Sequence, residues 1–173
     1  MNLASAIIVQ KYTLNKINKM DDLDVRILEV LQHDASLSNQ ALAERMLTSA
    51  ATTLRRVRAM QEAGIIEGTV CILSPEKLGA SITAIVEITL DVQNAESFNT
   101  FEALIDAEPA VLQAYRTAPS VDFTLLLTML DMAAYHALVQ RLFTAANNVR
   151  NVRSRFVTKR SKFSVAQPLP RVA

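Results

Sequence analysis

Three arginines stand close together in the first half of this 173-residue chain, at Arg55, Arg56 and Arg58. A guanidinium group can make paired hydrogen bonds to guanine or can bind a phosphate. The four residues from Ala50 to Thr53 are small, and small residues at a helix N-terminus allow close approach to the floor of the major groove. Threonine can also contact the thymine methyl group. These residue types therefore favour recognition of double-stranded DNA, with a solvated basic helix face as the alternative.

Three short amphipathic helices are predicted to position these arginines. Asp21, Ser38 and Ser49 are each suited to cap a helix, and a short break at 47–49 separates the second helix from the third. The apolar residues predicted to face a shared core are Leu23, Ile27, Leu28, Leu31, Leu42, Ala43, Met46, Leu54, Val57 and Met60. Two short helices joined by a sharp turn, with the arginines on the second, indicate a helix-turn-helix.

The third helix is predicted to end at Gly64, because helices commonly end on a left-handed glycine. Ile65, Ile66 and Val70 around Gly68 then indicate a strand or wing that returns to the core. We therefore assign residues 21–70 to a winged helix-turn-helix. Its expected DNA contacts are Ser38, Asn39, Ser49, Ala50, Ala51, Thr52, Thr53, Arg55, Arg56 and Arg58.

Separated blocks of the chain resemble the Lrp/AsnC family of transcriptional regulators, the leucine-responsive and asparagine-responsive proteins. The blocks are DDLDVRIL, ALAERM, LRRV, EAGII and LSPEKLG, which carry Asp21, Asp24, Ile27, Leu28, Leu42, Ala43, Glu44, Arg45, Leu54 to Val57, Glu62 to Ile66, Leu73 and Pro75 to Gly79. The chain departs from the family pattern at Leu47, Thr48 and Ala50, where the family has glycine, leucine and often proline. These departures affect the turn and the base preference rather than the fold.

The second half alternates strands with helices. Strands are predicted at 82–90, 111–117, 123–130 and 149–159. One helix is predicted to have its apolar face at 98–105 and to end at Glu108 and Pro109, and a second, capped by Asp131, to have its apolar face at 135–143, so the order is β-α-β-β-α-β. This order indicates a ferredoxin-like sheet with both helices on one side. The fold class is therefore α+β, with a winged helix-turn-helix followed by a ferredoxin-like βαββαβ domain. An identical subunit is the simplest cover for the open sheet face, which predicts a homodimer or a higher homo-oligomer.

This second half resembles the family's regulatory domain, which binds small amino acids through a loop containing glycine and aspartate. The corresponding residues here are Pro119, Ser120, Val121, Asp122 and Phe123. Pro119 replaces the glycine and offers no N–H to a ligand carboxylate. Asp122 is suited either to bind a ligand amine or to cap the turn before the next strand.

Composition fits two small domains: the net charge is only +1 and half of the residues are hydrophobic. Cys71 is the only cysteine, which excludes an internal disulfide and a cysteine-based zinc site and suits the cytoplasm. No metal or cofactor is expected. Residues 1–20 form an extension whose apolar run at 6–9 is too short to cross a membrane, and Met20 is a possible translation start.

Residues 71–81 are assigned as a linker, 82–163 as the ferredoxin-like domain and 164–173 as a tail. Beyond Asp131 every charged residue is basic, namely Arg141, Arg150, Arg153, Arg155, Lys159, Arg160, Lys162 and Arg171. This asymmetry suits either a longer DNA path or an anionic effector; the alternative is a charged strand edge that resists aggregation.

The sequence predicts a sequence-specific transcriptional regulator that responds to an amino acid, and not an enzyme. Two alternatives remain open. Sirohaem decarboxylases resemble the same family and use histidine and arginine, but the histidines His33 and His136 are more typical of surface residues. A regulatory partner subunit that does not read DNA by itself is the other alternative.

Overall fold

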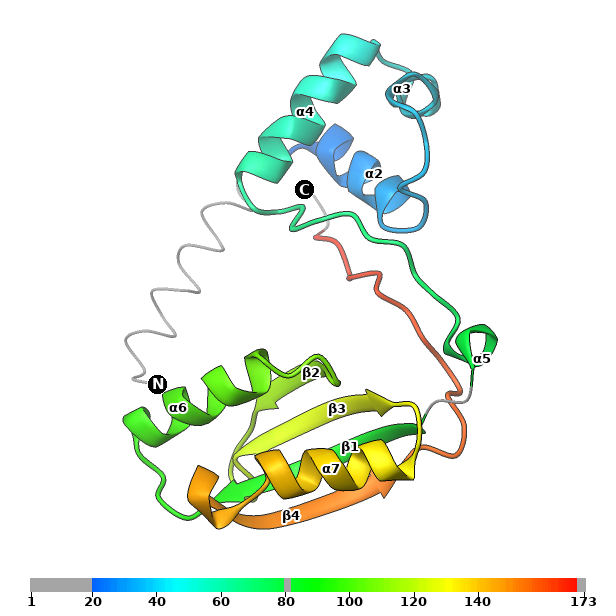
Figure 1. Ribbon diagram of the computed structural model, residues 1–173. Helices are drawn as coiled ribbons and strands as arrows, with labels where there is room; N and C mark the ends of the chain where they lie inside the picture. Colours follow the sequence, from blue (N-terminus) through cyan, green and yellow to red (C-terminus); the bar gives the residue numbers. More distant parts are fainter. Residues whose placement is uncertain (1–19, 80–81, 171–173) are drawn as a thin grey trace. The chain divides into compact units, whose positions relative to one another are not determined.

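The computed structural model describes residues 20–79 and 82–170 (Figure 1). The chain divides into two compact units. One joins the N-terminal part up to Cys71 with the C-terminal segment from Phe163, and the other spans Ile72–Lys162. Residues 1–19 of the extension expected at 1–20 lie outside the described residues. Within those residues, no helix combines the length and the apolar character that a membrane crossing requires.

The first unit contains three helices whose N-termini are capped as predicted. Their bounds are α2 Asp22–Leu31, α3 Asn39–Met46 and α4 Ala50–Glu62. The Asp21 carboxylate accepts two backbone N–H groups of the first turn of α2, and Ser38 and Ser49 each accept one at α3 and α4. These bonds satisfy donors that have no partner inside a helix.

The core of this unit confirms most of the predicted inward residues, but one prediction for α4 was wrong. Ile27, Leu42 and Met60 are buried, whereas Leu54 is 39% exposed and Thr53 is fully buried in its place. A step of three residues turns a helix about 60° short of a full circle, so positions 54, 57 and 60 cannot share one face closely. A spacing of seven residues returns almost to the same side, and it places Thr53 beside Met60.

The segment after α4 only partly follows its prediction. Gly64 has the expected positive φ of 68°, and Ile65 and Ile66 pack against the core. Val70, however, is 84% exposed, and no strand occurs in the described part of this unit. The predicted wing strand is therefore absent there, because no neighbouring strand supplies a hydrogen-bonding partner. A short helix, α5 Pro75–Leu78, follows in the segment assigned as the linker.

The second unit confirms the β-α-β-β-α-β order. Its elements are β1 Ile82–Leu90, α6 Ala95–Asp106, β2 Val111–Arg116, β3 Phe123–Met129, α7 Met132–Leu142, the 3₁₀ turn η1 Ala145–Asn147 and β4 Val149–Phe156. The strands form one antiparallel sheet in the order β2-β3-β1-β4, which is the ferredoxin-like arrangement. Helices α6 and α7 cover one face of this sheet (Figure 1).

Alternate residues of each strand separate a buried face from an open one. Val86 and Leu125 are fully buried under the helices. On the other face, Leu126 pairs with Ile85, and Ile85 with Arg155 on β4. The open face thus carries an apolar centre beside charged residues.

The C-terminal segment packs against the first unit. Leu169 contacts the helical core, and the N–H of Gln167 donates to Oε1 of Gln32 at 2.9 Å. The sequence predicts only a tail here, because a contact between positions 135 residues apart leaves no local pattern.

Candidate nucleic-acid interface and effector loop

One face of α4 is open to solvent and basic. Ala51, Arg55 and Arg58 are spaced four and three residues apart, so they lie on one side of the helix, and all three are exposed. Leu54 borders them at 39% exposure. This face combines a small residue near the N-terminus of α4 with two guanidinium groups farther along.

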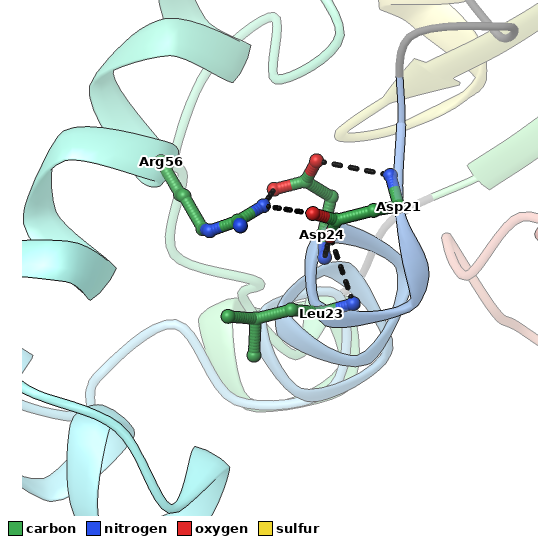
Figure 2. A network of polar contacts seen from close by, with 4 residues as sticks. All are labelled: Asp21, Leu23, Asp24 and Arg56. Atoms are coloured by element: carbon green, nitrogen blue, oxygen red, sulfur yellow. Dashed lines mark hydrogen bonds and ion pairs between the residues drawn. The ribbon is translucent and has the colours of Figure 1, made fainter.

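Arg56 points to a different place, toward the N-terminus of α2 (Figure 2). Its Nη1 atom lies 2.7 Å from Oδ2 of Asp21 and 2.8 Å from Oδ1 of Asp24. The hydrogen bonds to Asp24 and Asp21 raise the pKa of Arg56. The backbone hydrogen bond from Asp24, together with Arg56, lowers the pKa of Asp21 despite its partial desolvation. Arg56 therefore ties α4 to α2, and it does not belong to the open basic face.

Four other predicted DNA contacts also serve the local structure. Ser38 and Ser49 cap their helices, and the hydroxyl of Ser49 also donates to Oγ1 of Thr52 at 2.9 Å. Asn39 donates from Nδ2 to the carbonyl of Ala50 at 2.8 Å, which joins the starts of α3 and α4.

Thr53 is fully buried and donates its hydroxyl to the carbonyl of Ser49 at 3.2 Å. A side chain in this position cannot touch DNA. Of the predicted contacts in α4, the structure thus brings Ala51, Arg55 and Arg58 together on one open face. The side chain of Thr53 points into the core, and that of Arg56 points toward α2.

The turn before α4 is held by residues that sequence reasoning did not assign to the site. Leu47 adopts a left-handed conformation with φ of 57° and is 92% exposed. Arg26 on α2 donates from Nη2 to the carbonyl of Met46 at 2.8 Å. Leu47 had a sequence signal in its departure from the family's glycine, whereas no local pattern marks the contact of Arg26 with the Met46 carbonyl 20 positions away.

The effector loop is tied to β1 by its aspartate. Oδ2 of Asp122 accepts the N–H of Leu90 at 2.7 Å and Nε2 of Gln93 at 3.1 Å. The N–H of Asp122 donates to the carbonyl of Ile88. These bonds support the capping alternative for Asp122, because they use its carboxylate inside the protein.

The neighbours of Asp122 differ in accessibility. Pro119 and Ser120 are exposed, and Val121 accepts a hydrogen bond from the hydroxyl of Thr117 at 3.0 Å. Phe123 is 1% exposed and packs against Phe98 with ring centroids 5.9 Å apart. The loop therefore has a buried end and an exposed end.

Several residues of the basic C-terminal part pair with carboxylates. Arg155 donates to both oxygens of Glu87, and Nη2 of Arg141 lies 2.6 Å from Oε2 of the buried Glu108. Burial acts to raise the pKa of Glu108, but the N–H of Ala110 and the Arg141 guanidinium lower it overall. This pairing favours a structural role for Arg141 and Arg155 over a DNA path.

The two histidines lie in different units. Nδ1 of His33 is 2.8 Å from the carbonyl of Glu29 in α2, and the exposed ring of His136 meets Tyr135 edge-to-face on α7. No group of three potential metal-binding side chains occurs among the described residues. Each unit therefore contains one of the two histidines, and neither unit contains a histidine pair.

Comparisons with known proteins identify the family of the chain. Residues 20–67 match a family model for winged helix-turn-helix DNA-binding, and residues 83–166 match the Lrp/AsnC ligand binding domain. A helix-turn-helix transcriptional regulator of Haemophilus influenzae is 36% identical over 83% of this chain and 85% of its own length. The chain belongs to the Lrp/AsnC family. As an Lrp/AsnC protein it is a DNA-binding transcriptional regulator, and the comparisons do not support the decarboxylase alternative.

Solved structures agree with this assignment to the Lrp/AsnC family. An AsnC family transcriptional regulator from Agrobacterium tumefaciens is 33% identical, with a TM-score of 0.80 over 87% of this chain and 97% of its own. A transcriptional regulator from Neisseria meningitidis, solved in complex with L-methionine, is 28% identical with the same TM-score and the same coverage.

Proposed function

We propose that this Lrp/AsnC protein reads specific DNA sequences through the open face of α4, with Arg55 and Arg58 as its cationic contacts and Ala51 closest to the groove floor. The exposure of these three residues on one side of the helix is the observation that carries the proposal. We do not include Arg56 among the proposed DNA contacts, because two carboxylates already bind its guanidinium.

Local charge has to supply the attraction to DNA, since the whole chain carries a net charge of only +1. Each phosphate contact releases counterions, so it steepens the dependence of affinity on salt. A base-edge contact instead changes the preference for one base pair, with about 1–3 kcal/mol of discrimination. Arg55 and Arg58 can therefore be assigned to either role by measurement.

The test is fluorescence anisotropy of the full chain on operator fragments selected from genomic footprinting. We expect Arg55→Ala and Arg58→Ala each to weaken binding tenfold or more, with a flatter salt dependence where a phosphate contact is lost. Arg45→Ala, an exposed arginine at the end of α3, is the matched control. Unchanged affinity in both α4 variants, with intact folding, would contradict the proposed interface. A wild-type protein that binds no fragment would instead support the alternative of a partner subunit that does not read DNA by itself.

A homodimer that buries the open sheet face is part of the same proposal. Ile85 is 37% exposed at the centre of that face, with Leu126 beside it on β3. Glu87, Arg153 and Arg155 flank this centre, with Glu87 paired to both arginines. Sedimentation of the wild type as a dimer and of Ile85→Asp as a monomer would support this interface. Val92→Asp, an exposed position in the loop after β1, is the control.

Response to an amino acid is the third part of the proposal. The domain match and the L-methionine complex of the Neisseria meningitidis protein support it. We expect the operator affinity of this chain to change when one amino acid of a panel is added. No change with any of the twenty standard amino acids would contradict this part alone.

A further inference from the structure

The chain passes between its two units twice (Figure 1). The first link leaves the helical core after Ile66 and reaches β1 at Ile82. The second link leaves β4 at Phe156 and returns to the first unit. A domain that is joined by one linker reorients freely unless a large apolar interface holds it. A second covalent link restricts that freedom even where no such interface exists.

The second link ends in a docked segment, residues 163–170. Leu169 packs against the core of the helix-turn-helix unit, and the N–H of Gln167 donates to Oε1 of Gln32 at 2.9 Å. Gln32 is the residue that ends α2, and it is only partly exposed. The segment is therefore attached to the first unit by one apolar side chain and one hydrogen bond.

Two prolines prepare this segment for docking. Pro168 and Pro170 stand on either side of Leu169. Proline fixes its own φ and favours an extended conformation in the residue before it, so Gln167 and Leu169 have few backbone states to lose. A chain restricted in this way loses less conformational entropy when it docks. Docking is therefore favoured beyond what one leucine side chain would provide.

The docked link is the shorter of the two. An extended chain spans at most about 3.5 Å per residue, which allows about 55 Å between Ile66 and Ile82. The same rule allows only about 40 Å between Phe156 and Gln167. The difference, about 15 Å, is close to the distance of about 17 Å by which five base pairs move a DNA half-site along the duplex. The second link therefore sets the limit on this scale while the segment is docked.

We propose that residues 163–170 are a clasp that sets the spacing between the two half-sites that a dimer of this chain reads. While the clasp is docked, each helix-turn-helix unit stays within the shorter reach from β4, so the dimer binds half-sites over a narrow range of spacings. Without it, the first link alone sets the limit, and a wider range becomes accessible. The inference rests on the proposed DNA recognition and homodimer, and it adds the residues that restrict the choice of operator.

Fluorescence anisotropy of the full chain tests the clasp on an operator with two half-sites, selected from genomic footprinting. Five base pairs added between the half-sites also turn one of them about half a turn around the duplex. We expect this longer operator to bind the wild type at least tenfold more weakly. In Leu169→Asp, which releases the clasp, the loss should be less than threefold. Val165→Asp, at an exposed position of the same segment, should behave as the wild type.

Two lengthened chains separate the reach of the link from the stability of the unit. About ten glycine and serine residues placed between Ser161 and Lys162 lengthen the second link and leave Gln167 and Leu169 in place. This chain should tolerate the longer operator as Leu169→Asp does. The same residues placed after Gly68 lengthen only the first link, which is not limiting, so the wild-type preference should persist. Affinity for a single half-site should stay within twofold in every variant.

Three results would overturn the inference. An equal loss on the longer operator in the wild type, in Leu169→Asp and in the chain lengthened at 161–162 would mean that the spacing is set outside the clasp. A wild type that tolerates the longer operator would mean that no spacing is set. Loss of the dimer in sedimentation together with loss of the spacing preference would trace the effect to dimerisation.

In each of these cases the proposed DNA recognition would stand. A wild type that binds no operator would instead end that proposal together with this inference. Circular dichroism of each variant establishes that it is folded.

Discussion

Asp24 holds Arg56 across 32 positions of sequence, with 2.8 Å between Oδ1 of the carboxylate and Nη1 of the guanidinium. The contact joins the first turn of α2 to the middle of α4, and Asp21 completes it from the N-cap position. An arginine that stands between two DNA-facing candidates in the sequence is thus part of the scaffold that orients them. Its neighbour Arg55 is exposed on the adjacent side of the same helix.

Replacing Arg56 with methionine should lower the stability of the first unit more than it changes DNA contacts. The side chains of Arg56 and Asp24 are 26% and 13% exposed, so partial screening by solvent reduces the expected loss to about 1–2 kcal/mol. Urea unfolding followed by circular dichroism measures it. Arg55→Met should stay within about 0.5 kcal/mol of the wild type, since it changes an exposed position. Equal stability of the two variants would mean that the ion pair contributes nothing.

The buried Glu108 should make the second unit sensitive to acid. Its pKa is lowered in the folded state, so its contribution to stability is complete above the unfolded value near 4.5 and is lost as the pH falls through the folded value. We expect Glu108→Gln to cost about 1–2 kcal/mol at pH 7 and progressively less as the pH falls below 4.5. Thermal unfolding across this range is the measurement. A stability difference that does not shrink in acid would exclude ionisation of Glu108 as its cause.

The left-handed turn at Leu47 predicts a stabilising substitution. A leucine with φ of 57° is strained by its Cβ, and its side chain is 92% exposed and buries little surface. Leu47→Gly should relieve this strain and raise the stability of the first unit by about 0.5–1 kcal/mol, after allowance for the greater freedom of glycine in the unfolded chain. Thr48→Gly is the control, because Thr48 has no positive φ, and it should not stabilise the unit.

Sequence patterns predicted the elements better than the side-chain partners. Alternation and helical spacing identify strands and helices because they follow from backbone geometry, and Ser49 identifies a helix start because its cap bond is local. The roles of Arg56 and Thr53 depend on which side of α4 meets α2 and α3, and a strict step of three residues gave the wrong side. The partners of Arg116 are of the same kind, since this residue of β2 meets Phe98 and Glu102 only when α6 packs beside β2.

The contacts of the C-terminal segment with the first helices lead to a stability prediction that local sequence patterns do not suggest. Leu169 is half-buried against the core of the first unit, and Gln167 donates its N–H to Gln32, the residue that ends α2. Leu169→Ala should therefore lower the stability of this unit by about 1 kcal/mol.

Hydrogen exchange can localise that effect. In Leu169→Ala the amides of α2 that open with the unit should exchange about fivefold faster, because 1 kcal/mol corresponds to roughly that change in the opening equilibrium. The amides of β1 and β3 should keep their rates, since Leu169 is not part of their core. Val165→Ala, at a residue that is 52% exposed, is the matched control and should leave both sets unchanged. Unaltered exchange of α2 in Leu169→Ala would mean that the C-terminal segment does not stabilise the helix-turn-helix.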